Sequence, residues 1–111
     1  MNKIRIFSEK ILENTYYTRN FINYSNELSE IAKKHKGFIS STSYFADNIN
    51  QINKLNTLKI ITISEWKNIE SWDSWKKSSN RININNQYTN LEINEKFNIL
   101  YNRTNNDIFL L

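Results

Sequence analysis

The stretch Thr57-Leu-Lys-Ile-Ile-Thr-Ile-Ser-Glu-Trp66 carries the clearest secondary-structure signal in the chain. Its centre is almost continuously apolar, and its β-branched Ile and Thr residues favour a strand. Apolar side chains on both faces of a strand are typical of a central strand that is covered on both sides. We therefore expect residues 57–66 to form a central strand of a sheet.

The residues that precede this strand predict a strand followed by a helix. Residues 3–11 alternate apolar and polar side chains for much of their length, which favours a strand. Asn14 or Thr15 can then cap a helix. The apolar stripe of that helix follows helical spacing: Tyr17, Phe21, Tyr24, Leu28 and Ile31. The helix should end near Lys36, because Gly37 can adopt the left-handed conformation that terminates many helices.

A second strand and a second helix are predicted on either side of the central strand. Residues 38–46 are rich in Phe, Ile, Thr and Tyr and predict a strand, whereas the polar residues 47–56 predict a loop. Asn68 is placed to cap the second helix, and Glu70 and Asp73 put negative charge near its positive end.

The last third of the chain fits two interpretations at one point. Residues 81–85 alternate like a strand, yet Ile84, Tyr88 and Leu91 have helical spacing. Residues 96–103 predict a final strand. One face of this strand carries three large side chains: Phe97, Ile99 and Tyr101.

The order strand, helix, strand, strand, helix, strand is typical of the ferredoxin-like α+β fold. This βαββαβ arrangement is a four-stranded antiparallel sheet with two helices on one face. A central strand that is apolar on both sides needs a cover on the other face, and a second copy of the chain can provide it. We therefore expect a homodimer, and we expect the apolar tail at 108–111 to be buried at its interface rather than left exposed.

The composition of the chain excludes several kinds of protein and of functional site. A chain of 111 residues that is 39% hydrophobic predicts one domain over residues 1–111. The absence of cysteine excludes disulfides, zinc fingers and thiol nucleophiles. No run approaches the roughly 18 apolar residues of a membrane span, so we expect a cytoplasmic protein without a membrane partner. The net charge of +4 is spread along the chain, which argues against a nucleic-acid partner.

Several segments resemble the motifs of a known family. They are Gly37-Phe38-Ile39, the strand that ends at Trp66, Ser71-Trp72-Asp73-Ser74-Trp75 and Ser78-Ser79-Asn80-Arg81. Together they resemble the antibiotic biosynthesis monooxygenase family, over roughly residues 3–103. The resemblance implies the dimeric α/β barrel fold. It does not decide the reaction, because one scaffold can support many activities.

One branch of the family oxygenates quinol-like molecules without a cofactor. The resemblance implies an asparagine four residues before the tryptophan, an aromatic residue on the next helix and an arginine further along. The corresponding positions here are Thr62, Trp72 and Asn86, with Arg81 as the nearest arginine. Of these features only Trp66 is strictly retained, so an aromatic-lined cavity is implied more firmly than oxygen chemistry.

The haem-degrading branch fits the sequence less well. Its iron ligand is a histidine on the helix after the tryptophan, and that position falls near Asn85. No histidine follows His35, and an amide does not replace an imidazole ligand. His35 itself lies among lysines and is interpreted as solvent-exposed rather than as a general base.

Three residues are predicted to be catalytic: Trp66, Thr62 and Ser8. Trp66 either stacks on a flat substrate or fills the core as an ordinary buried aromatic. Thr62 shares its face of the strand, and Ser8 or Phe7 stands where the resemblance implies an asparagine on the first strand. Four further residues are predicted to bind substrate: Trp72, Tyr44, Tyr101 and Arg81. Trp72 also has a structural interpretation, because it forms an apolar stripe with Trp75.

The leading hypothesis is a small monooxygenase that needs no cofactor and no metal. Its partners would be dioxygen and a phenolic or quinol-like aromatic molecule in the barrel cavity. The alternative is a dimeric barrel that binds ligands or serves a stress response without catalysis. A haem-degrading monooxygenase is the third hypothesis.

Overall fold

A computed structural model describes residues 3–46 and 57–101. The elements follow the order β1 (Ile4–Leu12), η1 (Thr15–Tyr17), α1 (Thr18–Ala32), β2 (Phe38–Ala46), β3 (Leu58–Trp66), α2 (Ile69–Lys76), α3 (Ser79–Gln87) and β4 (Ile93–Leu100). The predicted loop 47–56 and the apolar tail at 108–111 lie outside the described residues. No helix of the described ranges has both the length and the apolar character that crossing a bilayer requires.

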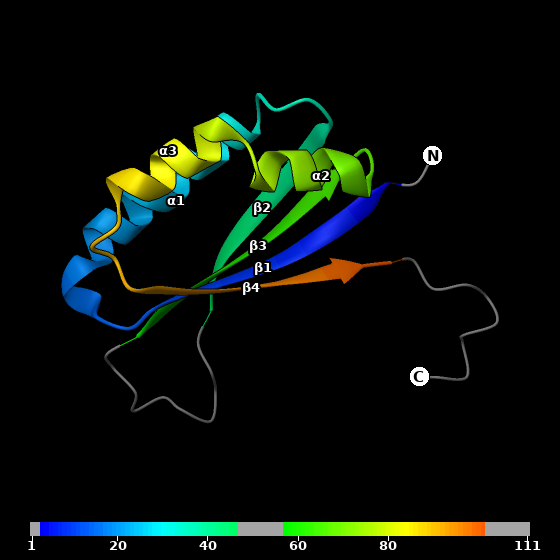
Figure 1. The fold of residues 1–111 in the computed structure, drawn as a ribbon. Coiled ribbons are helices and arrows are strands. Elements are labelled where there is room, and N and C mark those ends of the chain that lie inside the picture. The colour runs from blue at the N-terminus through cyan, green and yellow to red at the C-terminus, as the bar shows by residue number, and fades with distance from the viewer. Residues whose placement is uncertain (1–2, 47–56, 102–111) are drawn as a thin grey trace, which may run out of the picture.

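The four strands form one antiparallel sheet in the order β2-β3-β1-β4. This confirms the ferredoxin-like α+β fold and the central position of the strand that ends at Trp66. All the helices lie on one face of the sheet, with α1 and α3 side by side and α2 beside them (Figure 1). Ser8 pairs with Thr62 on β3 and with Phe97 on β4, so these three side chains share one face.

The first helix ends earlier than predicted. α1 stops at Ala32, and the chain then tightens into turns in which Lys34 and His35 donate backbone hydrogen bonds three residues back. Gly37 does take the predicted left-handed conformation, with φ of 94°. A Cβ at this position would overlap the side chain of Ser71, so the only glycine is required both by its backbone and by the close approach of α2.

The second helical region is divided into two helices, whereas one was predicted. Asn68 caps α2 as expected, because its side chain accepts a hydrogen bond of 2.8 Å from the backbone of Ser71. The Ser78 side chain then accepts one of 3.2 Å from the backbone of Arg81 and starts α3. Residues 81–85 are therefore helical. The last strand starts at Ile93 and ends at Leu100, shifted toward the N-terminus from the predicted 96–103.

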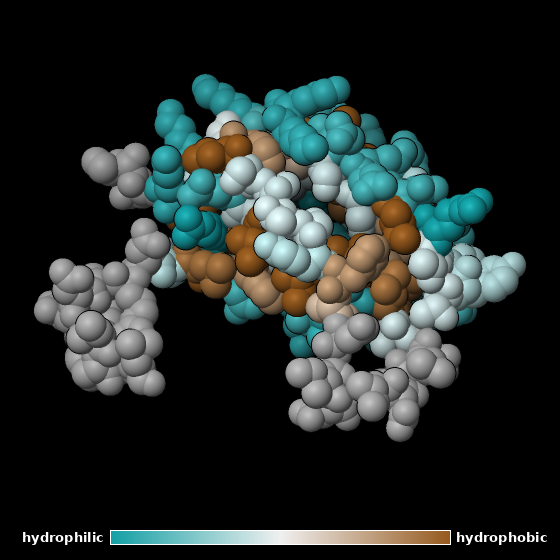
Figure 2. Space-filling model, turned by 180° about the vertical axis from the view of Figure 1, so that it is seen from behind, coloured by the Kyte–Doolittle hydropathy of each residue, from teal (hydrophilic) through white to brown (hydrophobic). Residues whose placement is uncertain are grey.

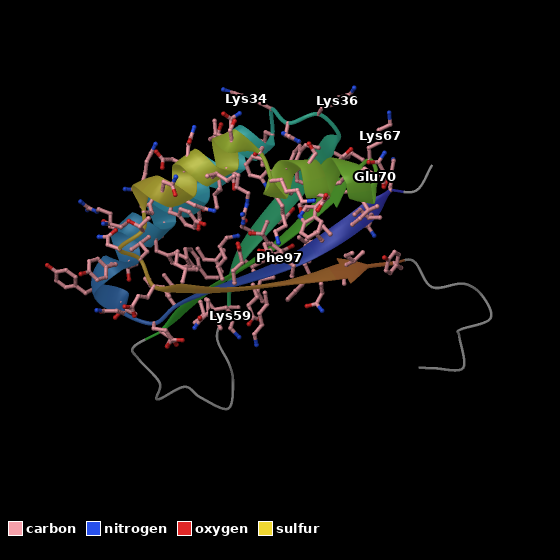
Figure 3. All side chains as sticks on the ribbon, in the orientation of Figure 1. Lys34, Lys36, Lys59, Lys67, Glu70 and Phe97 are labelled. Atoms are coloured by element: carbon pink, nitrogen blue, oxygen red, sulfur yellow. The ribbon has the colours of Figure 1, made fainter. Side chains whose placement is uncertain are left out.

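The core lies between the helices and the inner face of the sheet, which is the face that the helices cover. Seen from behind, hydrophobic residues gather across the middle of the molecule, below its hydrophilic top (Figure 2). Its largest fully buried side chains are Trp66, Phe21, Ile6 and Leu12. Phe97 projects into this layer, whereas Lys59 lies on the opposite side of the sheet (Figure 3). Within residues 3–46 and 57–101 no helix covers the outer face, which carries half-buried apolar side chains: Phe7, Ile61 and Ile63.

Candidate active site

A cavity of about 620 Å³, including the part open to solvent, lies between the inner face of the sheet and the helices. Strand alternation brings Ser8, Thr62 and Ser64 into its floor, and α1 supplies Ser25 and Ser29. Five aromatic side chains line the same cavity: Phe38, Trp66, Trp72, Trp75 and Phe97. The cavity thus combines aromatic walls with a cluster of hydroxyl groups.

Five of the seven predicted site residues line this cavity: Trp66, Thr62, Ser8, Trp72 and Arg81. Ser8 is 6% and Arg81 7% exposed, so both polar side chains are drawn into the interior. Thr62 is held by a 2.8 Å hydrogen bond between its Oγ1 and the Oγ of Ser43.

Tyr44 and Tyr101 do not line the cavity. Tyr44 is 54% exposed and pairs with Ile61, which places it out of phase with the cavity-facing Ser41 and Thr62. Tyr101 is 74% exposed and follows the last residue of β4. The predicted strand 96–103 includes Tyr101, whereas β4 ends at Leu100.

Trp66 is fixed by its neighbours at the end of β3. Its indole Nε1 donates a 2.9 Å hydrogen bond to the Oγ of Ser64, and only 1% of the residue is exposed. The Trp75 ring stacks at 6.4 Å between centroids and 23° between planes, and the Phe38 ring meets it edge-on at 5.3 Å. Trp66 is therefore both a core residue and part of the cavity wall.

A cluster of Lys10, Arg81 and Glu95, which the sequence patterns did not predict, lies at the cavity. The Lys10 Nζ is 3.1 Å from a carboxylate oxygen of Glu95 and donates a 3.1 Å hydrogen bond to the Oγ of Ser8. The Nη2 of Arg81 donates to both carboxylate oxygens of Glu95, at 3.0 and 3.1 Å. The alternation of β1 could have predicted the burial of Lys10, because it lies on the same face of the strand as the buried Ile6, Ser8 and Leu12.

Lys10 and Glu95 both have a lowered pKa, but for different reasons. Burial lowers the pKa of Lys10 below that of an ordinary lysine, although Glu95 opposes the shift. Burial by itself would raise the pKa of Glu95, but Lys10 and Arg81 outweigh it and lower that pKa. Burial thus disfavours the charged form of Lys10, whereas its two cationic neighbours favour the charged form of Glu95.

Solved structures resemble the chain over nearly its whole length. SnoaB, a cofactor-independent oxygenase from Streptomyces nogalater, superposes with a TM-score of 0.70 at 9% identity, over 94% of this chain and 96% of its own. A solved antibiotic biosynthesis monooxygenase gives 0.70 at 9% identity, over 91% and 99%. A conserved protein from Methanosarcina mazei Go1 gives 0.69 at 21% identity, over 93% and 95%.

The chain has the fold of the antibiotic biosynthesis monooxygenases. At these identities the likeness establishes the fold alone, because one fold can carry many reactions. No protein-family model and no curated protein matches the sequence.

Within this antibiotic biosynthesis monooxygenase fold, Asn85, at the position of the haem ligand in the resemblance, and His35 both contact polar side chains of other elements. The Oδ1 of Asn85 accepts a 2.7 Å hydrogen bond from the hydroxyl of Tyr24. The Nε2 of His35 lies 3.1 Å from the Oγ of Ser74, outside the cavity wall. In residues 3–46 and 57–101, no three His, Asp or Glu side chains gather in a way that could hold a metal ion.

Proposed function

We propose that the cavity binds a small phenolic or quinol-like aromatic molecule and that dioxygen oxidises it there without a cofactor. The observation that supports this most directly is the joining of five aromatic side chains and several hydroxyls in one cavity beside Trp66. Flat aromatic molecules pack favourably against such rings, and the hydroxyls can orient a phenol. SnoaB, which shares the fold, is a cofactor-independent oxygenase.

In the proposed reaction the residues of this chain bind and orient, and the substrate supplies the electrons. Ser8 and Thr62 hydrogen-bond the phenolic oxygen and favour its ionised form, while Trp66 and Trp72 hold the ring. The ionised ring passes electrons to dioxygen. For an anthrone, the methylene carbon loses two hydrogens and gains one oxygen atom as a carbonyl, and the second oxygen atom leaves as water.

The test is incubation of the protein with a model anthrone under air and under nitrogen. We expect anthraquinone to form faster than in protein-free buffer only under air, with product followed by mass spectrometry. Thr62→Val should slow the reaction, and Lys34→Met, at an exposed turn, should leave it unchanged. Equal rates with and without protein would remove this activity for anthrones.

A non-catalytic ligand-binding protein is the second candidate. Thr62 stands at the position where the resemblance implies an asparagine. The specific observation is that its hydroxyl is already hydrogen-bonded to that of Ser43. A side chain occupied in this way is less available to a substrate. Stabilisation of the protein by flat aromatic ligands in a thermal-shift assay, with none of them converted, would favour this candidate.

We also propose that two copies pack their outer sheet faces together. The support is that all the described helices lie on the other face of the sheet (Figure 1). On the outer face, β1 and β3 carry the half-buried Phe7, Ile61 and Ile63. Sedimentation velocity should then give the mass of a dimer. Ile61→Lys should give the mass of a monomer, because the interface would bury a lysine of each copy against the lysine of the other. Lys34→Met should still give the mass of a dimer. A wild-type monomer at all concentrations would overturn the proposal.

A further inference from the structure

The cavity is lined by basic side chains and, among the described residues, by no acidic one. Lys10, Lys76 and Arg81 all contribute to its wall. The side chains of Lys10 and Arg81 are only 12% and 9% exposed. The Nζ of Lys76 lies 4.3 Å from the centroid of the Phe97 ring, so its charge is held against the aromatic wall. Cations therefore surround the same space as the aromatic rings.

Glu95 neutralises only one of the two deeply buried cations. It contacts both Lys10 and Arg81 and is not among the residues that line the cavity. One carboxylate shared by two cations leaves one positive charge uncompensated among the described residues. A buried charge without a counter-ion lowers the stability of the protein, because it loses its hydration and gains no equally strong interaction. An anion in the cavity would offset this cost.

Hydrogen-bond donors remain available at the same place. The ammonium of Lys10 has three protons, and two acceptors are found among the described residues: Glu95 and Ser8. Both hydrogen bonds of Arg81 to Glu95 come from Nη2, so Nε and Nη1 have no acceptor in the described ranges. The Oγ of Ser25, in the cavity wall, is buried and has no hydrogen-bond partner among the residues that the structure describes.

We propose that the end of the cavity at Lys10 and Arg81 binds an anionic oxygen group, so that the ligand is an aromatic molecule carrying a carboxylate. This inference rests on the proposed aromatic-ligand cavity. Lys10 and Arg81 bind the charged oxygens, and the ring lies along Trp66, Trp72 and Phe97. The positive surroundings that stabilise the ionised form of Glu95 stabilise the ionised ligand in the same way.

The experiment compares two probes of nearly equal shape, 2-naphthoate and 2-naphthamide, by isothermal titration calorimetry at pH 7. The wild-type protein should bind the carboxylate at least tenfold more tightly than the neutral amide. Lys10→Met should remove most of that preference and leave the affinity for the amide within about twofold. Lys34→Met, which removes an exposed lysine, should retain the preference.

The outcomes separate this inference from the proposed function. Equal affinities of the wild type for the two probes would overturn the anionic site and leave the aromatic cavity standing. Binding of neither probe would overturn both. The wild-type comparison is decisive even if Lys10→Met does not fold, and retention of the full preference by a folded Lys10→Met would overturn the role of Lys10.

Discussion

The indole of Trp66 is tethered to Ser64, two residues earlier on the same face of β3, by a hydrogen bond of 2.9 Å from Nε1 to Oγ. The donor is buried, since 1% of Trp66 is exposed. The hydrogen bond therefore fixes the plane of a ring that belongs both to the core and to the cavity wall. Buried indole nitrogens usually find such a partner.

Ser64→Ala should destabilise the protein by about 1–3 kcal/mol, because the buried Nε1 of Trp66 loses its acceptor. Urea unfolding followed by tryptophan fluorescence measures the change. Ser40→Ala, on an exposed position of β2, should stay within about 0.5 kcal/mol of the wild type. Equal stability of Ser64→Ala and Ser40→Ala would mean that water replaces the lost hydroxyl.

Gly37→Ala should cost more than about 1 kcal/mol, because the position has φ of 94° and the new methyl group would overlap Ser71. The double variant Gly37→Ala with Ser71→Gly tests the two causes separately. It should recover the part of the loss due to overlap, relative to Ser71→Gly alone, and retain the backbone strain. Full stability of the single variant would show that the turn accommodates a side chain.

Glu95→Gln should lower the free energy of unfolding by about 2 kcal/mol or more at pH 7, because Lys10 and Arg81 lose their only described counter-charge. The pKa of Glu95 is lowered from 4.5, so its stabilising effect is present above that pH and is lost as the pH falls through the folded-state value. The difference between wild type and variant should therefore shrink in urea titrations as the pH falls below 4.5. A difference that is constant over this range would contradict the ionic role.

Tyr24→Phe should cost about 1 kcal/mol at pH 7, because the 2.7 Å hydrogen bond to Asn85 is lost. Burial, assisted by Glu95, raises the pKa of Tyr24 from 10.0 to about 12. The wild type should therefore lose stability as the pH rises from 10 to 12, since the unfolded chain releases this proton first. Tyr24→Phe should show a shallower decline in thermal melts, while Tyr16→Phe, on a ring that is 85% exposed, should follow the wild type.

Local patterns predicted most of the elements and several of the site residues. The period of two along β3 placed Thr62, Ser64 and Trp66 on one face, because successive strand side chains point to opposite faces. The one glycine marked a turn that needs a left-handed backbone. These features depend on residues close in sequence, so a pattern of a few residues is enough to predict them.

Local patterns were enough for the order of the strands along the chain, the alternation of β3 between its two faces and the place of the left-handed turn, because each follows from local backbone geometry. The position of Tyr101 outside the cavity depends on long-range contacts, since the limits of an edge strand depend on its pairing with β1. Only the register of β1 against β4 places Glu95 opposite Lys10, and only the packing of α3 brings Arg81 to the same carboxylate. A buried charge cluster depends on contacts between distant segments, and no local period records them.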